Sequence, residues 1–296
     1  MKLGYCCINT ELTSPNKGCV VKTIEKNGVG HSIELAKKNL EAVMAILEWN
    51  FDHHLHVYRM SSDMLPQYTN PMLSKDGRLF DLAILSQHFD RLGELSKRYD
   101  QRLTFHPGQF NQVGTPRWEV FEKTRADLSM HADILDRIGC SPNSVIVVHG
   151  GGSYGDKPTT MTRWSDQFKK LPLSVQQRLV IENCERQYNY SDILELSKAI
   201  DRPVVFDLHH HQCYSQAVEE QPDPETFIDK IIATWSAKKL RPKLHISNQA
   251  EGKRLGAHSD YVDAIPDYLL KMEVDLMIEA KAKEGAVLRL KEKYGI

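Results

Sequence analysis

The sequence has no excess of one charge sign and no long apolar run. Lys and Arg total 38 and Asp and Glu total 39, so the formal net charge is −1. Binding to nucleic acid would therefore need a local basic patch or bound metal ions. No apolar run approaches the roughly 20 residues that cross a bilayer, and the N-terminal residues lack the apolar stretch of a signal peptide. We therefore expect a cytosolic protein without membrane contact.

Cysteine pairs, compositional linkers and a dinucleotide-binding glycine motif are also missing. The chain has no C-x-x-C pair, so reduced thiols are expected at Cys6, Cys7, Cys19, Cys140, Cys184 and Cys213. No G-x-G-x-x-G follows the first strand-like run, which argues against a doubly wound sheet. Apolar residues make up 41% and charged residues 26% of the 296 positions, which is ordinary for a folded core. We expect one domain over residues 1–296.

Short β-branched runs alternate with longer amphipathic stretches along the whole chain. The expected strands are 3–9, 56–60, 102–105, 144–148, 178–181, 203–206, 243–246 and 274–278. The expected helices are 31–49, 81–99, 116–138, 159–170, 191–200, 224–238, one that follows the seventh strand through Leu269, and a basic C-terminal helix. Eight such units predict an α/β fold, a single-domain (β/α)₈ TIM barrel.

Metal-ligand residue types gather at the ends of six consecutive expected strands. In parallel barrels the active site forms at these carboxyl ends. The candidate metal ligands there, or in the loops that follow, are His106, His149, Glu182, Asp207, His210, His245, His258 and Glu279. Each residue alone is weak evidence, but five imidazoles and three carboxylates in one mouth would suffer desolvation and repulsion without cations. The pattern therefore predicts a metal site.

The mixture of imidazole and carboxylate groups suits Zn²⁺, Mn²⁺ or Fe²⁺ better than Ca²⁺. Eight candidate ligands exceed the needs of one ion, so we expect two or three ions, with Glu182 able to bridge them. Adjacent cations lower the pKa of a bound water and stabilise an in-line phosphoryl displacement. This chemistry would suit hydrolysis of a phosphodiester.

Two features near the expected ligands leave alternatives open. Lys243 precedes His245 by two residues, so both side chains point to the same side of a strand. Lys243 either contacts a phosphate, is carbamylated by CO₂, or is simply angled towards solvent or DNA. In the run His209-His210-His211, His210 is the expected ligand, and its two neighbours are expected at the surface or behind the ligands.

Several motifs in order along the chain carry a family resemblance. They are Leu3-Gly4-Tyr5 with Asn9, Tyr58-Arg59-Met60-Ser61-Ser62, His106-Pro107-Gly108-Gln109-Phe110, His149-Gly150-Gly151-Gly152, Glu182-Asn183-Cys184-Glu185, Asp207-Leu208-His209-His210, Pro242-Lys243-Leu244-His245, Gly256-Ala257-His258 and Glu279-Ala280-Lys281. With these motifs the chain resembles the UV damage endonuclease family, which is related to metal-dependent apurinic endonucleases of the endonuclease IV type. The resemblance implies a TIM barrel that nicks damaged double-stranded DNA immediately 5′ to UV photoproducts (cyclobutane pyrimidine dimers and 6-4 photoproducts). A metal-activated hydroxide would leave 3′-hydroxyl and 5′-phosphate ends without ATP.

The resemblance also implies roles for individual residues. His106 and His149 would share one ion bridged by Glu182. A second ion would be held by Glu182, Asp207, His245 and Glu279, and a third by His210 with His258. Catalytic roles would fall to Glu182, Lys243 and Tyr5, and contacts to DNA or the lesion to Gln109, Phe110, Tyr5, Asn9 and Arg59.

Two positions depart from the family pattern, which usually has Tyr where Phe110 stands and, in some relatives, His where Asn70 stands. Phe110 can still stack on a base without the tyrosine hydroxyl, and the alternative is that Phe110 packs under its own loop. Asn70 is left out of the ligand set. We expect Mn²⁺, with Zn²⁺, Mg²⁺ or Co²⁺ as alternatives, and a monomer that joins the nucleoid when it binds DNA. The competing hypotheses are a barrel sugar isomerase or epimerase, an apurinic-site endonuclease, and a non-enzymatic metal- or DNA-binding module.

Overall fold

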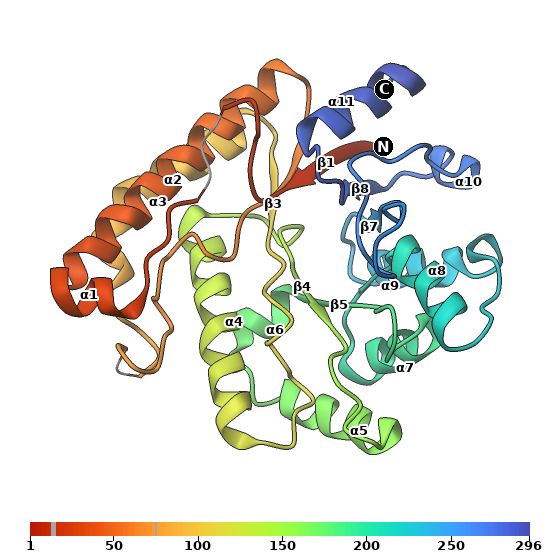
Figure 1. Ribbon diagram of the computed structural model, residues 1–296, viewed down its shortest axis with the longest axis horizontal. Coiled ribbons are helices and arrows are strands. Elements are labelled where there is room, and N and C mark those ends of the chain that lie inside the picture. Colours follow the sequence, from red (N-terminus) through yellow and green to blue (C-terminus); the bar gives the residue numbers. More distant parts are fainter. Residues whose placement is uncertain (13–15, 75) are drawn as a thin grey trace.

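A computed structural model describes residues 1–12, 16–74 and 76–296 (Figure 1). Its strands are β1 (Lys2–Cys6), β2 (Val57–Arg59), β3 (Arg102–Thr104), β4 (Ile146–His149), β5 (Leu179–Glu182), β6 (Val204–Val205), β7 (Lys243–Ile246) and β8 (Asp275–Ile278). Its α-helices are α1 (Val21–Asn27), α2 (Val29–Asp52), α3 (Ser86–Arg98), α4 (Trp118–Ile138), α5 (Lys157–Phe168), α6 (Leu173–Arg178), α7 (Tyr190–Ile200), α8 (Leu208–Ala217), α9 (Ile228–Ser236), α10 (Asp267–Leu270) and α11 (Glu284–Tyr294). Short 3₁₀ turns cover Leu82–Leu85 and Pro224–Thr226.

The eight strands form a parallel barrel in sequence order. Two ladders, β3-β2-β1-β8-β7 and β4-β5-β6, are joined by single bridges between Phe105 and Ile146 and between Asp207 and His245. Backbone hydrogen bonds support both junctions, since Phe105 N donates to Val145 O at 3.0 Å and His245 N donates to Phe206 O at 3.0 Å. The expected TIM barrel is confirmed. Helices α2, α3 and α4 lie on one side of it in Figure 1, with α7, α8 and α9 on the other.

Alternating side chains divide each strand between two buried layers. Ile146 and Ile181 belong to the large core that packs against the helices, whereas Val147 and Val180 join a separate cluster with Trp235. Because successive strand residues point to opposite faces, the second set lies inside the barrel. His149 lies two residues after Val147, and Glu182 lies two residues after Val180. Both ligand candidates therefore point to the same side as these valines, into the barrel mouth.

The barrel interior is polar towards its amino-terminal end. Nη1 of Arg102 donates to Oδ2 of Asp275 at 2.8 Å, and Nε of Arg241 donates to Oδ1 of the same carboxylate at 2.6 Å. The Asp275 side chain is only 1% exposed, so the two guanidiniums supply the partners that a buried carboxylate requires.

The helices differ from the expected ones in four places. The long helix expected after the seventh strand is wrong: residues 247–266 contain no helix, and only the four-residue α10 follows. The sequence Ser247-Asn248-Gln249 to Gly256 is rich in turn formers, which compete with helix for backbone hydrogen bonds. Helices α1, α6 and α8 were not expected. No helix among the described residues is long and apolar enough to span a membrane.

Candidate metal centre at the barrel mouth

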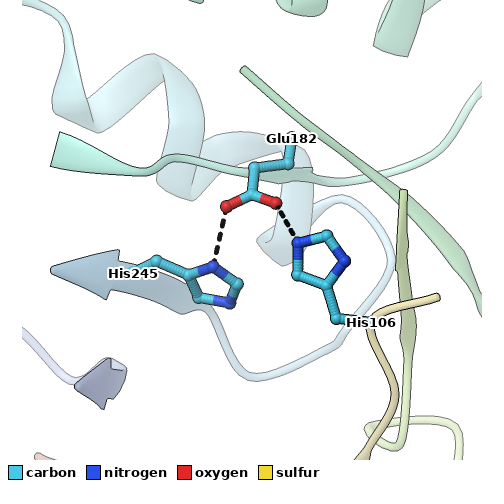
Figure 2. A group of neighbouring side chains, drawn as sticks. All are labelled: His106, Glu182 and His245. Atoms are coloured by element: carbon cyan, nitrogen blue, oxygen red, sulfur yellow. Dashed lines mark hydrogen bonds and ion pairs between the residues drawn. The ribbon is translucent and has the colours of Figure 1, made fainter. Parts of the chain in front are cut away.

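Glu182 lies at the centre of the site, with its carboxylate between two imidazoles (Figure 2). Its Oε1 is 2.7 Å from Nδ1 of His245, and its Oε2 is 2.7 Å from Nε2 of His106. Glu182 and His245 are fully buried, and His106 is 12% exposed. The carboxyl end of β5 therefore places one carboxylate where groups from β3 and β7 converge.

The remaining ligand candidates surround this centre. Nδ1 of His149 is 3.6 Å from Oε2 of Glu182, and Nδ1 of His210 is 3.8 Å from its Oε1. Nδ1 of His245 is 3.2 Å from Oε1 of Glu279, whose Oε2 is 3.7 Å from Nδ1 of His258. All eight candidates thus meet in one mouth.

Ligand atoms within 4.8 Å of one another define three groups. The groups are His106 with Glu182 and His245, His149 with Glu182 and His210, and Asp207 with His245 and Glu279. His258 lies beside the third group through Glu279. Glu182 and His245 each belong to two groups, so neighbouring sites would share ligands.

Local backbone structure explains why Asp207 and His210 face the same point. Asp207 is the N-cap of helix α8, and its Oδ1 accepts a hydrogen bond from His210 N at 2.8 Å. The helix start brings residues three apart onto one side. His209 and His211 were expected at the surface or behind the ligands. The surface position is wrong, because His209 is 1% exposed and His211 is 4% exposed.

Asn183 positions two neighbouring strand ends, a role that the sequence reasoning missed. Its Oδ1 accepts from Asp207 N at 2.8 Å and its Nδ2 donates to Asp207 O at 2.9 Å. Its own carbonyl oxygen lies 3.1 Å from Nδ1 of His210. A buried amide directly after Glu182 was the available signal, since such a group must find partners nearby.

The buried charges shift several pKa values in opposite directions. Burial lowers the pKa of His149 to about 4 and that of His245 to about 3, so both imidazoles are neutral and able to donate a lone pair. Burial raises the pKa of Asp207 to about 7. Burial opposes the charged form of His210, but Asp207 and neighbouring carboxylates outweigh it and raise the pKa of His210 to about 9.

Lys243 has no solvent exposure, so the alternative that it is angled towards solvent or DNA is wrong. Its Nζ lies 2.6 Å from Nε2 of His245, inside the barrel. Burial, with the nearby guanidiniums of Arg59 and Arg102, lowers the pKa of Lys243 to about 7. A substantial share of this amine is therefore neutral near physiological pH.

Three residues expected to contact DNA are engaged within the protein. Tyr5 is fully buried and Asn9 is 1% exposed. The Tyr5 hydroxyl donates to Oδ1 of Asn50 at 2.7 Å and accepts from Nδ2 of Asn9 at 2.9 Å. Arg59 Nη1 pairs with Oε1 of Glu279. Strand parity directs Tyr5 to Trp49 of helix α2 and Cys6 to the interior, so Tyr5 does not face the DNA or lesion that it was expected to contact.

Gln109 and Phe110 lie at an exposed loop tip after β3, and the Phe110 side chain is 69% exposed. The alternative that Phe110 packs beneath its loop is therefore wrong. Asn70 belongs to a local turn, with its Oδ1 accepting from Met72 N at 2.9 Å and its Nδ2 donating to Gln67.

The donor set fits divalent cations. Oε2 of Glu182, Oδ2 of Asp207 and Nδ1 of His149 are buried, and none has a hydrogen-bond partner within residues 1–12, 16–74 and 76–296. The approach of His106 to Glu182 is an ion-pair distance without hydrogen-bond alignment. Buried lone pairs without donors are costly, and cations bound in the neighbouring ligand groups would satisfy them.

Fold and site together define a TIM barrel with a carboxylate–imidazole cluster at the carboxyl ends of its strands. The family model described as UV-endonuclease UvdE matches residues 1–295, and the chain belongs to this family. A UV-damage endonuclease of Schizosaccharomyces pombe is 33% identical over 99% of this chain and 50% of its own length. A UV DNA damage endonuclease of Bacillus velezensis is 33% identical over 88% of this chain and 81% of its own. The crystal structure of SacUVDE covers 100% of this chain and 98% of its own, with a TM-score of 0.89 and 27% identity.

Proposed function

We propose that this protein is a metal-dependent endonuclease that nicks double-stranded DNA immediately 5′ to UV photoproducts and leaves 3′-hydroxyl and 5′-phosphate ends. The observation that carries the proposal is the buried Glu182 carboxylate held between His106 and His245, with a second carboxylate group, Asp207 and Glu279, around His245. Family membership and the names of the relatives supply the substrate class.

The eight candidate ligands would hold two or three divalent ions, with Glu182 as the shared residue. Bound there, such ions would lower the pKa of a water and stabilise charge on the phosphoryl oxygens. The neutral imidazoles of His149 and His245 are ready to bind a cation, whereas His210 first loses its proton. We expect Mn²⁺, because mixed imidazole and carboxylate shells suit it.

The exposed tip formed by Gln109 and Phe110 would distinguish damaged from undamaged duplex. A planar apolar side chain that is 69% exposed can wedge between stacked bases, and a damaged step costs less to open. The formal charge of −1 offers little attraction for DNA, so bound ions would supply much of the local positive charge.

The direct test incubates supercoiled plasmid, irradiated or not, with the purified protein and Mn²⁺, with EDTA in a parallel sample. Nicking confined to irradiated plasmid and abolished by EDTA is the expected result. A duplex with one cyclobutane dimer, labelled at either end, then locates the cut and identifies both ends. Equal nicking of both plasmids, or no nicking together with turnover of a ketose or aldose, would overturn the proposal.

A matched pair of variants connects any activity to this site. Glu182→Gln removes the central carboxylate charge, whereas Glu94→Gln makes the same change on the exposed face of helix α3. Only the first should lose cleavage, and full activity in both would remove the site from the reaction.

A further inference from the structure

The side chain of Gln112 joins the loop that carries the exposed Gln109-Phe110 tip to a second loop. Nε2 of Gln112 donates to the carbonyl oxygen of Gln109 at 2.6 Å. Its Oε1 accepts from Gly152 N at 2.8 Å and lies 3.3 Å from the Tyr154 hydroxyl. One amide group therefore joins the tip after β3 to the glycine-rich loop after β4.

The glycine loop is shaped around this amide. A Cβ atom at Gly151 would lie 2.5 Å from Oε1 of Gln112, and the φ angle of Gly151 is +87°. A side chain at this position would both strain the backbone and displace the amide. Gly151 thus leaves the space through which the Gln112 side chain reaches the backbone of the glycine loop.

The backbone on the far side of the tip is also anchored. Gln112 N donates to Oγ1 of Thr124 at 3.0 Å, and Nδ2 of Asn111 donates to Oδ2 of Asp127 at 2.9 Å, both on helix α4. From helix α5, Nε of Arg163 donates to the Gly114 carbonyl oxygen at 2.8 Å. Only Gln109 and Phe110 project from this framework.

We propose that Gln112 is a positioning residue for damage recognition, fixing the Gln109-Phe110 tip against the glycine loop so that the tip enters the duplex as a rigid wedge. An inserted side chain separates two stacked bases only if its own loop deforms less easily than the base stack. Holding a loop in its bound conformation before binding also removes the cost of ordering it on the DNA. The inference rests on the proposed function, because the duplex is its substrate.

The test compares Gln112→Ala and Gln112→Glu with Gln87→Ala, a control on the exposed face of helix α3. The Glu variant keeps an acceptor for Gly152 N but cannot donate to Gln109 O, so it isolates the bond to the tip. Duplex opening is followed by the fluorescence of 2-aminopurine opposite a cyclobutane dimer after rapid mixing. Hydrogen exchange at the Gly152 amide reports on the loop itself without DNA, and metal content and circular dichroism report on the fold.

Both Gln112 variants should lose about five- to tenfold in kcat/KM on damaged duplex, as expected for a bond of ordinary strength, with reduced duplex opening and unchanged metal content. Exchange at Gly152 should accelerate in Gln112→Ala and stay slow in Gln112→Glu. In a Phe110→Ala background, Gln112→Ala should add nothing, because both act through one tip.

Duplex opening at the wild-type level in either Gln112 variant, or additive losses in the double variant, would overturn this role for Gln112. The proposed function would still stand in that case if the wild-type protein discriminates irradiated from unirradiated DNA. If the wild-type protein itself cuts irradiated and unirradiated duplex equally, the proposed function fails and this inference fails with it.

Discussion

Nζ of Lys243 and Nε2 of His245 lie 2.6 Å apart on strand β7, and both side chains are fully buried. The pKa of Lys243 is lowered to about 7, chiefly by burial. A neutral amine reacts with CO₂ to give a carbamate and a proton, and the product would be an anion beside the ligand candidates. This gives the carbamylation hypothesis a physical basis.

Intact mass of the protein under native conditions should therefore show an adduct of about 44 Da that is lost on acidification. Lys243→Met should lack the adduct and lose cleavage. The absence of any labile adduct in an active preparation equilibrated with bicarbonate would exclude the carbamate and leave Lys243 as a buried amine.

Loss of either central carboxylate should abolish cleavage without unfolding the protein. Glu182→Gln and Glu279→Gln each remove one negative charge from a set of buried ligand candidates. Mutation of a residue that only hydrogen-bonds to a metal ligand lowers metal affinity or activity by about 10- to 100-fold. Loss of a ligand itself should therefore lower kcat/KM by at least about 100-fold. Nicking assays, circular dichroism and elemental analysis measure rate, fold and metal content; undiminished nicking in both variants would refute the assigned cluster.

Metal binding should tighten as the pH rises from 6 to 8. The pKa of His210 is raised to about 9 and that of Asp207 to about 7, so both carry protons over part of this range and must release them to bind a cation. For each ligand that must lose a proton, the apparent affinity for the cation rises about tenfold per unit increase in pH, as long as the pH is below the pKa of that ligand. Calorimetric titration of metal-free protein with Mn²⁺ at three pH values measures this slope, and a flat profile would contradict the assignment of His210.

Removing the exposed ring should impair recognition more than metal binding. Stacking of one base on an aromatic side chain contributes about 1–3 kcal/mol, so Phe110→Ala should lose roughly 5- to 150-fold in kcat/KM on damaged duplex. Phe110→Tyr keeps the ring and should retain activity, whereas Phe110→Leu should not. Equal activity of the Ala variant on damaged duplex would show that the ring is not a wedge.

Tyr5 should contribute to stability and not to catalysis. Its buried hydroxyl bonds to Asn50 and Asn9, so Tyr5→Phe should lower the free energy of unfolding by about 1 kcal/mol, measured by urea denaturation. Cleavage per folded molecule should stay at the wild-type level. A large loss of kcat with unchanged stability would return Tyr5 to the catalytic set.

The alternation of side chains along the strands explains which site residues could be predicted from the sequence and which could not. Glu182, His245 and Glu279 continue the inward positions of their strands, so their convergence followed from pattern and barrel closure alone. Tyr5 occupies an outward position with Leu3, but strand β1 is buried on both faces, so only the structure shows that Tyr5 packs against Trp49. The motif resemblance drew attention to the residue, but the geometry of the strand decided its direction.

The sequence by itself determined the eight strand units, the ligand residue types at the strand ends and the apolar side chain in the loop after the third strand, because each depends on local periodicity or on position relative to a strand. Only the tertiary structure decided which atoms share a site, that Lys243 is sealed beside His245, that Arg59 pairs with Glu279, and that Gln112 spans two loops. Those contacts join residues distant in the chain, and their geometry depends on barrel closure and side-chain packing, which no local pattern encodes.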